Sequence, residues 1–220
     1  MNAQFWHQRW QRGELGWHDD GFNRHLAEYW PSLSLPAQTR VFVPLCGKSL
    51  DMVWLASRGY RVLGVEISAV GVDAFCDENG LTPGIADGPP FQRYTMYEIE
   101  ILVGDFFDLR PAHLQGVGAV YDRASLIALP PAMRPRYARH LAALLPPDVE
   151  SLLITLEYDS DRMSGPPFAV ASAEVHALFA AAFEVELLAT FDVLAESRRF
   201  RERGLNWLNE QVYRLRRLPN

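Results

Sequence analysis

The 220-residue chain lacks several features that would point to particular classes of protein. It has two cysteines, Cys46 and Cys76, which are too few for a disulfide framework and lack the spacing of a metal site. Its six histidines show no HExxH or comparable ligand pattern, so we expect no metal centre. The sequence contains no run of about 18 apolar residues and no basic, apolar leader at its start. We therefore expect a cytoplasmic protein that neither crosses a membrane nor is secreted.

Positive charge is also scarce. The formal net charge is -6, and Lys48 is the single lysine of the chain. An acidic protein is poorly suited to bind nucleic acid or an anionic membrane, so the expected partner is a small molecule. A hydrophobic content of 49% with 12% aromatics suits one domain with a full core. We expect residues 1–220 to form that single domain as a monomer, with residues 1–35 as part of it.

One stretch, VFVPLCGKSLDMVWLASRGYRVLGVEIS over residues 41–68, predicts a βαβ unit. The apolar run 41–43 stops at Pro44, which cannot donate to a sheet ladder. Ser49 is expected to cap a helix with apolar residues at helical spacing, and Gly59 is expected to stop it. The run 61–65 is then a second strand that ends at Glu66. Since ligands bind outside the carboxyl ends of parallel strands, this unit predicts a ligand site there.

The loop of this unit has the spacing of a nucleotide site but few of its glycines. Gly47 and Glu66 stand about 20 residues apart, the separation at which an acid commonly binds ribose hydroxyls. A Walker A loop needs glycine where this chain has Phe42, and a dinucleotide fingerprint needs three glycines where this loop has one. An adenosine ligand without phosphates fits better, and S-adenosylmethionine is the obvious candidate. A routine turn followed by a surface glutamate is the alternative interpretation.

Aromatic residues crowd the first thirty positions. Trp6 and Trp10 are four residues apart and would share a helix face, and a second amphipathic stretch runs from about residue 20 to 30. One interpretation is a helix pair that packs on the sheet. The other is a helical lid over the ligand, because aromatic faces attract a sulfonium cation and stack on planar heterocycles. The residues concerned are Phe5, Trp6, Trp10, Trp17, Phe22, Tyr29 and Trp30.

The rest of the chain continues the alternation of strands and helices. We expect a helix from Ser68 to Gly80, a loop rich in proline and glycine over 83–90, and a hairpin formed by 91–96 and 98–103. Further strands are expected at 117–121 and 151–156, a helix at 132–145 and another from Ser172. The runs 183–188 and 208–215 are predicted to form an antiparallel pair.

Polar residues follow three of these strands and are candidates for the same ligand site. Asp105 and Phe106 could contact an adenine ring, or form an exposed turn and part of the core. Asp122 and Arg123 could face the reactive end of the ligand, or be ordinary surface charges. Glu157 ends another strand, before a Gly-Pro-Pro-Phe loop at 165–168 that is either a pocket wall or a plain turn. A basic cluster, most simply a solvated face, comprises Arg198, Arg199, Arg201 and Arg203.

The pattern FWHQRWQRGELGWH, followed by the 41–68 stretch, closely resembles the thiopurine S-methyltransferase family. The likeness continues through DFFDL, YDRASLIALP and GPPF and covers essentially the whole chain. The resemblance implies an α/β class I methyltransferase with a Rossmann-like, mostly parallel seven-stranded sheet, helices on both faces and an N-terminal helical lid. It also implies methyl transfer from S-adenosylmethionine to sulfur of aromatic or heterocyclic thiols, with selenium or tellurium compounds as further acceptors.

The resemblance also implies roles for individual residues. Cofactor-binding positions would be Trp10, Leu45, Glu66 and Arg123, with Gly47, Asp105 and Phe106 in the same pocket. Trp17 and either Arg198 or Arg199 would lie on the acceptor side. We expect direct in-line displacement that depends mainly on positioning. A heterocyclic thiol can arrive ionised, so a general base is not required; its candidates would be Asp19, Asp122 and Glu157, with Arg123 as a further catalytic candidate.

Two other functions fit parts of the sequence. A nicotinamide-dependent oxidoreductase would use Lys48 to meet a phosphate, although the missing glycines argue against it. A non-catalytic module could bind the same cofactor and act through a partner.

Overall fold

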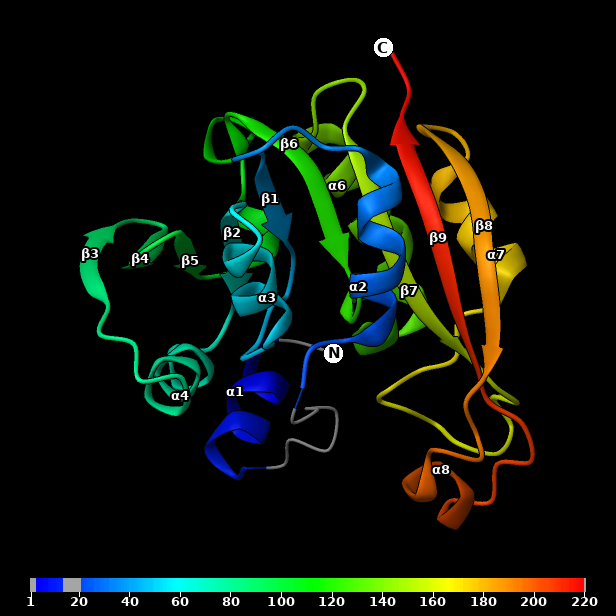
Figure 1. The fold of residues 1–220 in the computed structure, drawn as a ribbon. Helices are drawn as coiled ribbons and strands as arrows, with labels where there is room; N and C mark the ends of the chain where they lie inside the picture. The colour runs from blue at the N-terminus through cyan, green and yellow to red at the C-terminus, as the bar shows by residue number, and fades with distance from the viewer. Residues whose placement is uncertain (1–2, 14–20, 220) are drawn as a thin grey trace. The chain divides into compact units, whose positions relative to one another are not determined.

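The computed structural model describes residues 3–13 and 21–219 (Figure 1). The chain comprises two compact units, residues 1–121 and 122–220. The single domain expected from the sequence stays a prediction. In the described part of the chain, no helix has both the length and the apolar character needed to cross a membrane.

The first unit is built on strands in the order β3-β4-β5-β2-β1-β6. Their bounds are β1 Arg40–Val43, β2 Arg61–Glu66, β3 Gly84–Gly88, β4 Phe91–Met96, β5 Ile99–Val103 and β6 Val117–Asp122. Strand β1 pairs in parallel with β2 and β6, and β2 pairs in parallel with β5. The carboxyl ends of these four parallel strands therefore point the same way, which is where the predicted ligand residues begin.

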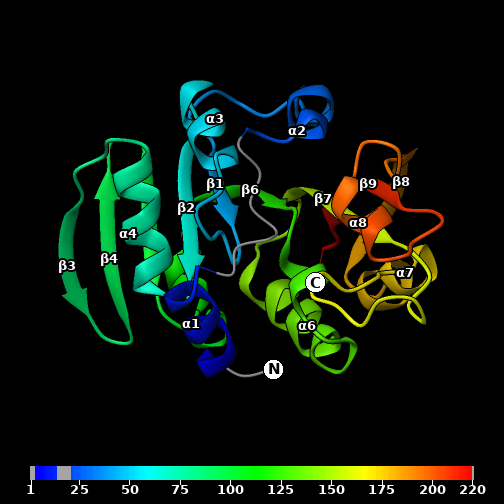
Figure 2. The ribbon, with the colours of Figure 1, turned by 90° about the horizontal axis from the view of Figure 1, so that it is seen from below.

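The helices of the first unit match the predicted pattern closely. They are α1 Ala3–Gln11, α2 Arg24–Tyr29, α3 Asp51–Ser57 and α4 Ala69–Glu78. Gly59 and Gly80 follow α3 and α4 at φ values of 84° and 62°, the left-handed conformation that commonly ends a helix. Figures 1 and 2 show α3 alongside β2 and α1 beside α4. The βαβ unit β1-α3-β2 is thus confirmed.

The region between α4 and β6 differs from the prediction in two ways. Residues 84–88 form strand β3, which pairs antiparallel with β4, where we expected only a loop. Strand β5 pairs antiparallel with β4 and also in parallel with β2, so it belongs to the parallel part of the sheet as well as to the predicted hairpin. The described residues consequently form nine strands instead of seven. Every residue of β3 is exposed, so the strand lacks the apolar alternation by which sequence patterns reveal a strand.

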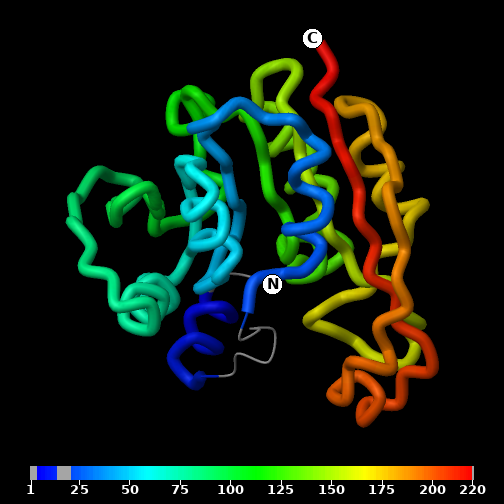
Figure 3. Tube along the Cα trace, in the orientation of Figure 1, coloured from blue at the N-terminus to red at the C-terminus, as the bar shows by residue number. Residues whose placement is uncertain are grey.

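The second unit contains three strands in the order β7-β9-β8. Its elements are α5 Ser125–Ala128, α6 Arg134–Leu144, β7 Glu150–Glu157, α7 Ser172–Phe179, β8 Phe183–Asp192, α8 Arg198–Glu202 and β9 Asn209–Arg217. Strand β9 pairs antiparallel with both β7 and β8, which confirms the predicted pair of strands. Figure 3 shows β8 and β9 running side by side, with α8 in the connection between them.

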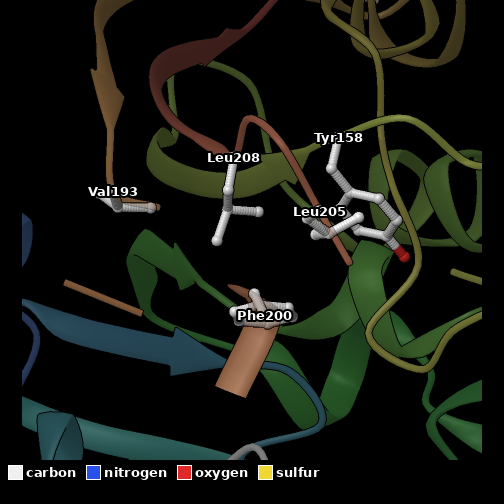
Figure 4. Packing of buried hydrophobic residues seen from close by; sticks show 5 residues of the cluster. All are labelled: Tyr158, Val193, Phe200, Leu205 and Leu208. Atoms are coloured by element: carbon white, nitrogen blue, oxygen red, sulfur yellow. The ribbon is translucent and has the colours of Figure 1, made fainter. Parts of the chain in front are cut away.

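One hydrophobic cluster holds this connection in place. Figure 4 shows its five buried side chains, which come from β7's end, from α8 and from the segments around it. They are Tyr158, Val193, Phe200, Leu205 and Leu208. The Tyr158 hydroxyl donates to the Pro167 carbonyl oxygen at 2.5 Å, which ties the 165–168 loop to the end of β7. The cluster therefore fixes both the α8 segment and this loop.

Candidate active site

The loop after β1 begins the candidate site. Leu45 and Gly47 have φ values of 47° and 54°, and for a branched residue such as leucine this left-handed conformation is uncommon and strained. The Cys46 N–H donates to the Val65 carbonyl oxygen at 3.0 Å, which fastens the loop to the end of β2. The loop thus turns sharply at the carboxyl end of the sheet, with its backbone directed at the residue that follows Val65.

That residue is Glu66, a buried carboxylate that is 6% exposed. Its Oε2 accepts from the Gly47 N–H and its Oε1 from the Ser68 N–H, both at 3.0 Å. Burial raises the pKa of Glu66 to about 7, although hydrogen bonds from Ser68, Gly47, Ile67 and the Trp10 side chain lower it. A buried carboxyl held by backbone amides is an oriented acceptor for hydroxyl donors.

Trp10 on α1 lies against the same loop. Its side chain is 5% exposed and is hydrogen bonded to Glu66. A β-carbon placed on Gly47 would lie 3.5 Å from Cζ2 of the indole, so the ring lies beside this glycine with room for about one methyl group between them. The structure therefore brings together three residues that the sequence predicts as neighbours: Trp10, Gly47 and Glu66.

Asp105 and Phe106 follow β5, the strand next to β2. The Gly104 N–H donates to the Glu66 carbonyl oxygen at 2.9 Å, so the ends of the two strands adjoin. The Asp105 carboxylate accepts from the Phe107 N–H at 2.9 Å and caps a short helical turn. Phe106 is buried and its ring stacks on Phe42 with centroids 6.4 Å apart. Both residues thus have structural roles at a strand end beside Glu66, and their predicted contact with adenine stays a prediction.

Lys48 forms an ion pair with a carboxylate of a neighbouring helix. Its Nζ lies 2.5 Å from Oε1 of Glu78 on α4, and its side chain is 9% exposed. This pairing gives no support to the nicotinamide-dependent alternative, because the lysine is already committed to a carboxylate.

Asp51 is a buried acid that the sequence analysis did not single out. Its Oδ1 accepts from the Asn23 N–H at 2.7 Å and its Oδ2 from the Tyr121 hydroxyl at 2.9 Å. Asn23 in turn caps α2 by accepting from the N–H groups of His25 and Leu26. Asp51 therefore anchors the start of α2 to α3 and β6. Its only signal in the sequence is an acid in the first turn of a helix, which is common at any helix start.

In the second unit, Asp122 is buried and is already paired. Its Oδ2 accepts from the Tyr137 hydroxyl at 2.6 Å and its Oδ1 from the Ser125 N–H at 3.2 Å. Burial raises the pKa of Asp122, against these hydrogen bonds. The same burial, together with the charge of Asp122, raises the pKa of Tyr137 well above its usual range. The geometry makes Asp122 an anchor for the turn that carries Arg123, and its candidacy as a base stays a prediction.

The other predicted residues of this unit lie on separate segments. Arg123 is partly buried between β6 and α5. Glu157, at the end of β7, accepts from Gln211 Nε2 at 2.7 Å. Arg198 pairs with Glu202 at 2.6 Å on α8 and is largely exposed, whereas the Arg199 guanidinium lies 4.7 Å from the Phe200 ring centroid. Trp17 and Asp19 lie outside the described residues.

The donor set suits a ligand rich in hydroxyl groups. Residues 3–13 and 21–219 contain no group of three or more His, Cys, Asp or Glu side chains able to hold a metal ion. The loop 45–47 offers one glycine and a left-handed leucine, while Glu66 offers oriented oxygen acceptors. A ribose diol matches such a carboxylate, whereas a pyrophosphate would need a cradle of N–H donors that a single glycine does not build.

Solved structures share the fold at low sequence identity. A S-adenosylmethionine-dependent methyltransferase from Methanosarcina mazei aligns with a TM-score of 0.62 and 16% identity, over 90% of this chain and 100% of that one. The Burkholderia thailandensis 1,6-didemethyltoxoflavin-N1-methyltransferase aligns with a TM-score of 0.65 and 17% identity, over 99% of this chain and 87% of its own. That structure was solved with S-adenosylhomocysteine bound. The class I methyltransferase fold expected from the sequence is confirmed.

Sequence comparison is more specific. The family model for thiopurine S-methyltransferase matches residues 1–218. The chain is 50% identical over 217 residues to the thiopurine S-methyltransferase of Pseudomonas paraeruginosa, covering 99% of this chain and 100% of that protein. It is 49% identical over 215 residues to that of Nitrosospira multiformis, covering 98% of each. The chain therefore belongs to the thiopurine S-methyltransferase family and is an S-adenosylmethionine-dependent methyltransferase.

Proposed function

We propose that this chain methylates the sulfur atom of aromatic or heterocyclic thiols such as thiopurines, and that small selenium and tellurium compounds are further acceptors. The observation that carries the proposal is the buried Glu66 carboxylate beside Gly47 and Trp10, in a chain about half identical to proteins named thiopurine S-methyltransferase. Thiopurines are synthetic, so the physiological acceptor is better sought among small thiols and their heavier analogues.

When bound, S-adenosylmethionine supplies an electrophilic methyl group on a sulfonium, which an acceptor sulfur displaces directly. Glu66 would hold the ribose hydroxyls, since its two oxygens are already oriented by the Gly47 and Ser68 amides. Leu45 and Gly47 would let the loop approach the ligand closely, because both residues have left-handed backbone conformations. These residues bind and orient, which is where most of the acceleration of such a transfer can come from.

Other residues would complete the cofactor site. Trp10 would offer its indole face, which suits a sulfonium cation. Asp105 and Phe106 would lie at the adenine end, and Arg123 would bind a carboxylate of the cofactor or an anionic acceptor.

On the acceptor side we propose Trp17 with Arg198 or Arg199. An arginine there would favour a thiolate, the nucleophilic form of a thiol. The exposed position of Arg198 and the placement of Arg199 over Phe200 leave both guanidinium groups near the surface of α8. Asp122 is less suited to remove a proton, because Tyr137 and Ser125 already use its oxygens. A heterocyclic thiol that arrives ionised needs no base.

The decisive experiment measures cofactor binding and methyl transfer separately. Isothermal calorimetry with S-adenosylmethionine should show that Glu66→Ala and Arg123→Ala each weaken binding by roughly 1.5 to 3 kcal/mol, the cost of losing a hydrogen bond to a charged group. Matched controls are Glu98→Ala, an exposed residue before β5, and Arg139→Ala, an exposed residue of α6. Unchanged affinity in both site variants would refute the assignment.

The acceptor is tested with methyl-labelled S-adenosylmethionine and a panel of an aliphatic thiol, an aromatic thiol, a thiopurine and an inorganic selenium or tellurium oxyanion with a thiol reductant. We expect transfer to the aromatic and heterocyclic thiols in a single turnover. If cofactor binds normally and no member of the panel accepts a methyl group, the non-catalytic binding module becomes the better description.

A further inference from the structure

Gly71, in the first turns of α4, lies directly under the indole of Trp10. A β-carbon built on Gly71 would be 2.8 Å from both Cε2 and Cζ2 of Trp10 and 3.1 Å from Cδ2. Contacts of 2.8 Å do not occur for real β-carbons, so the ring and a side chain at position 71 cannot share this space. Figure 2 shows α1 and α4 as neighbouring helices.

The position of the Trp10 indole above Gly71 also determines the other contacts of this ring. From there the indole reaches Gly47, where an added β-carbon would lie 3.5 Å from Cζ2, and its N–H is hydrogen bonded to Glu66. The ring is held between two glycines on separate segments of the chain, Gly71 on α4 and Gly47 in the loop. A shift away from Gly71 would therefore move the N–H relative to the carboxylate.

Backbone conformation does not explain a glycine at position 71. Its φ lies outside the left-handed range, in the interior of a helix where glycine is unfavourable relative to alanine. The close contact with the Trp10 ring does distinguish glycine from alanine at this position, because the methyl group of alanine would overlap the ring.

We propose that Gly71 is a positioning residue for the cofactor site: its missing side chain seats the Trp10 indole so that the ring meets the Gly47 loop and donates to Glu66. The inference rests on the proposed function, in which Trp10 and Glu66 bind S-adenosylmethionine. A methyl group at position 71 lifts the ring from this seat, while the helix itself gains a better helix former.

The position of the Trp10 ring above Gly71, called the seat below, is tested first without any cofactor. In nitrogen-15-labelled protein, Trp10→Phe identifies the indole N–H signal of Trp10 by its disappearance. In Gly71→Ala we expect that signal to move and to exchange faster with solvent, because its hydrogen bond to Glu66 is lost. Gly21→Ala is the matched control, since an added β-carbon there meets no atom of residues 3–13 and 21–219 within 4 Å and its backbone is not left-handed. An unmoved Trp10 signal in Gly71→Ala would overturn the proposal.

The functional part is tested by calorimetry with S-adenosylmethionine. Gly71→Ala should raise its dissociation constant about tenfold, the loss that accompanies one hydrogen bond to a charged group, and Gly21→Ala should leave it unchanged. In a Trp10→Ala background, Gly71→Ala should change it less than about twofold, because the ring that the methyl displaces is gone. Additive effects would mean that Gly71 acts independently of Trp10, against the proposal.

These outcomes separate the seat from the proposed function. If the indole signal moves but cofactor affinity is unchanged in Gly71→Ala, the seat exists and its role in cofactor binding is refuted. If wild-type protein does not bind S-adenosylmethionine, the proposed function fails while the signal still tests the seat. Should Gly71→Ala alone not fold, Gly71→Ala with Trp10→Leu must fold, since the smaller side chain leaves room for the methyl; a failure of that pair contradicts the steric argument.

Discussion

At the scale of single residues, Glu66 combines two requirements that oppose each other. A ligand with hydroxyl groups needs an ionised acceptor, yet burial favours the neutral carboxyl and raises the pKa of Glu66 to about 7. The amides of Gly47 and Ser68 offset part of this cost by donating to both oxygens. The protonation of Glu66 therefore changes in the neutral pH range, where it affects both stability and binding.

Glu66 should make the protein less stable as pH rises toward neutral. The carboxyl has a pKa near 4.5 when unfolded and about 7 when folded, so between these values the folded state binds more protons. The free energy of unfolding then falls as pH rises through this interval, with a slope of at most about 1.4 kcal/mol per pH unit, and levels off above it. Urea titrations of wild type and Glu66→Gln at half-unit steps from pH 4.5 to 8 measure this as the difference between the two proteins.

Binding should follow the opposite trend. The affinity for S-adenosylmethionine should increase as pH rises through about 7, because the ionised carboxylate is the better acceptor. Glu66→Gln should remove this rise.

The urea titrations provide the opposing outcome for the stability prediction. If the difference in unfolding free energy between wild type and Glu66→Gln does not change from pH 4.5 to 8, Glu66 is already ionised in the folded protein at pH 5.

At the scale of elements, Arg134 at the start of α6 connects several segments of the second unit. Its side chain is fully buried. The guanidinium donates to the carbonyl oxygens of Leu126, Leu129 and Ala169, and pairs with Glu174 on α7 at 2.7 Å. One side chain thus fixes the end of α5, the segment after the Gly-Pro-Pro loop and the start of α7. These segments lie outside the strands, so sheet pairing cannot hold them together.

Replacement of Arg134 by methionine should therefore be costly. It removes the guanidinium donor from three carbonyl oxygens and from Glu174, whose side chain is 32% exposed. Leaving a buried acceptor without its donor typically lowers stability by about 1 to 3 kcal/mol. Chemical denaturation measures the change. Arg139→Met on the same helix is the control, since Arg139 is exposed and should change stability by less than about 0.5 kcal/mol. Equal effects of the two substitutions would contradict the role of Arg134.

The elements themselves differ in how far the sequence could predict them. The β1-α3-β2 unit was predictable, because apolar runs, helical spacing and Gly59 all agree. Strand β3 was not, since every one of its residues is exposed and its strand conformation comes from pairing with β4. Asp122 was placed correctly at a strand end, but its partner Tyr137 lies on α6, and no local pattern reveals that hydrogen bond. Sequence spacing located the acids, and tertiary contacts decided their environments.

At the scale of the whole chain, the sequence predicts a single domain, whereas the structure contains two compact units, residues 1–121 and 122–220. The residues that we propose to bind the cofactor include Glu66 of the first unit and Arg123 of the second. If the chain folds as one domain, cofactor binding should stabilise both units together.

Calorimetry tests this directly. We expect one thermal transition whose calorimetric and van't Hoff enthalpies agree. S-adenosylmethionine at about 100 times its dissociation constant should add about 2.7 kcal/mol and raise the midpoint by roughly 5 to 10 °C. NAD at the same concentration should have no effect. Two separate transitions, of which the ligand shifts only one, would show that the units unfold as independent domains.

The ion pair between Lys48 and Glu78 has a practical consequence. Because Lys48 is the chain's single lysine, amine-directed acylation has one side chain to modify, and its product can be assigned by mass spectrometry without ambiguity. Its Nζ is paired with Glu78 on α4, the helix that also carries Gly71, so acylation requires this ion pair to open. The rate of acylation of this side chain would thus report how often the contact between the loop after β1 and the end of α4 opens.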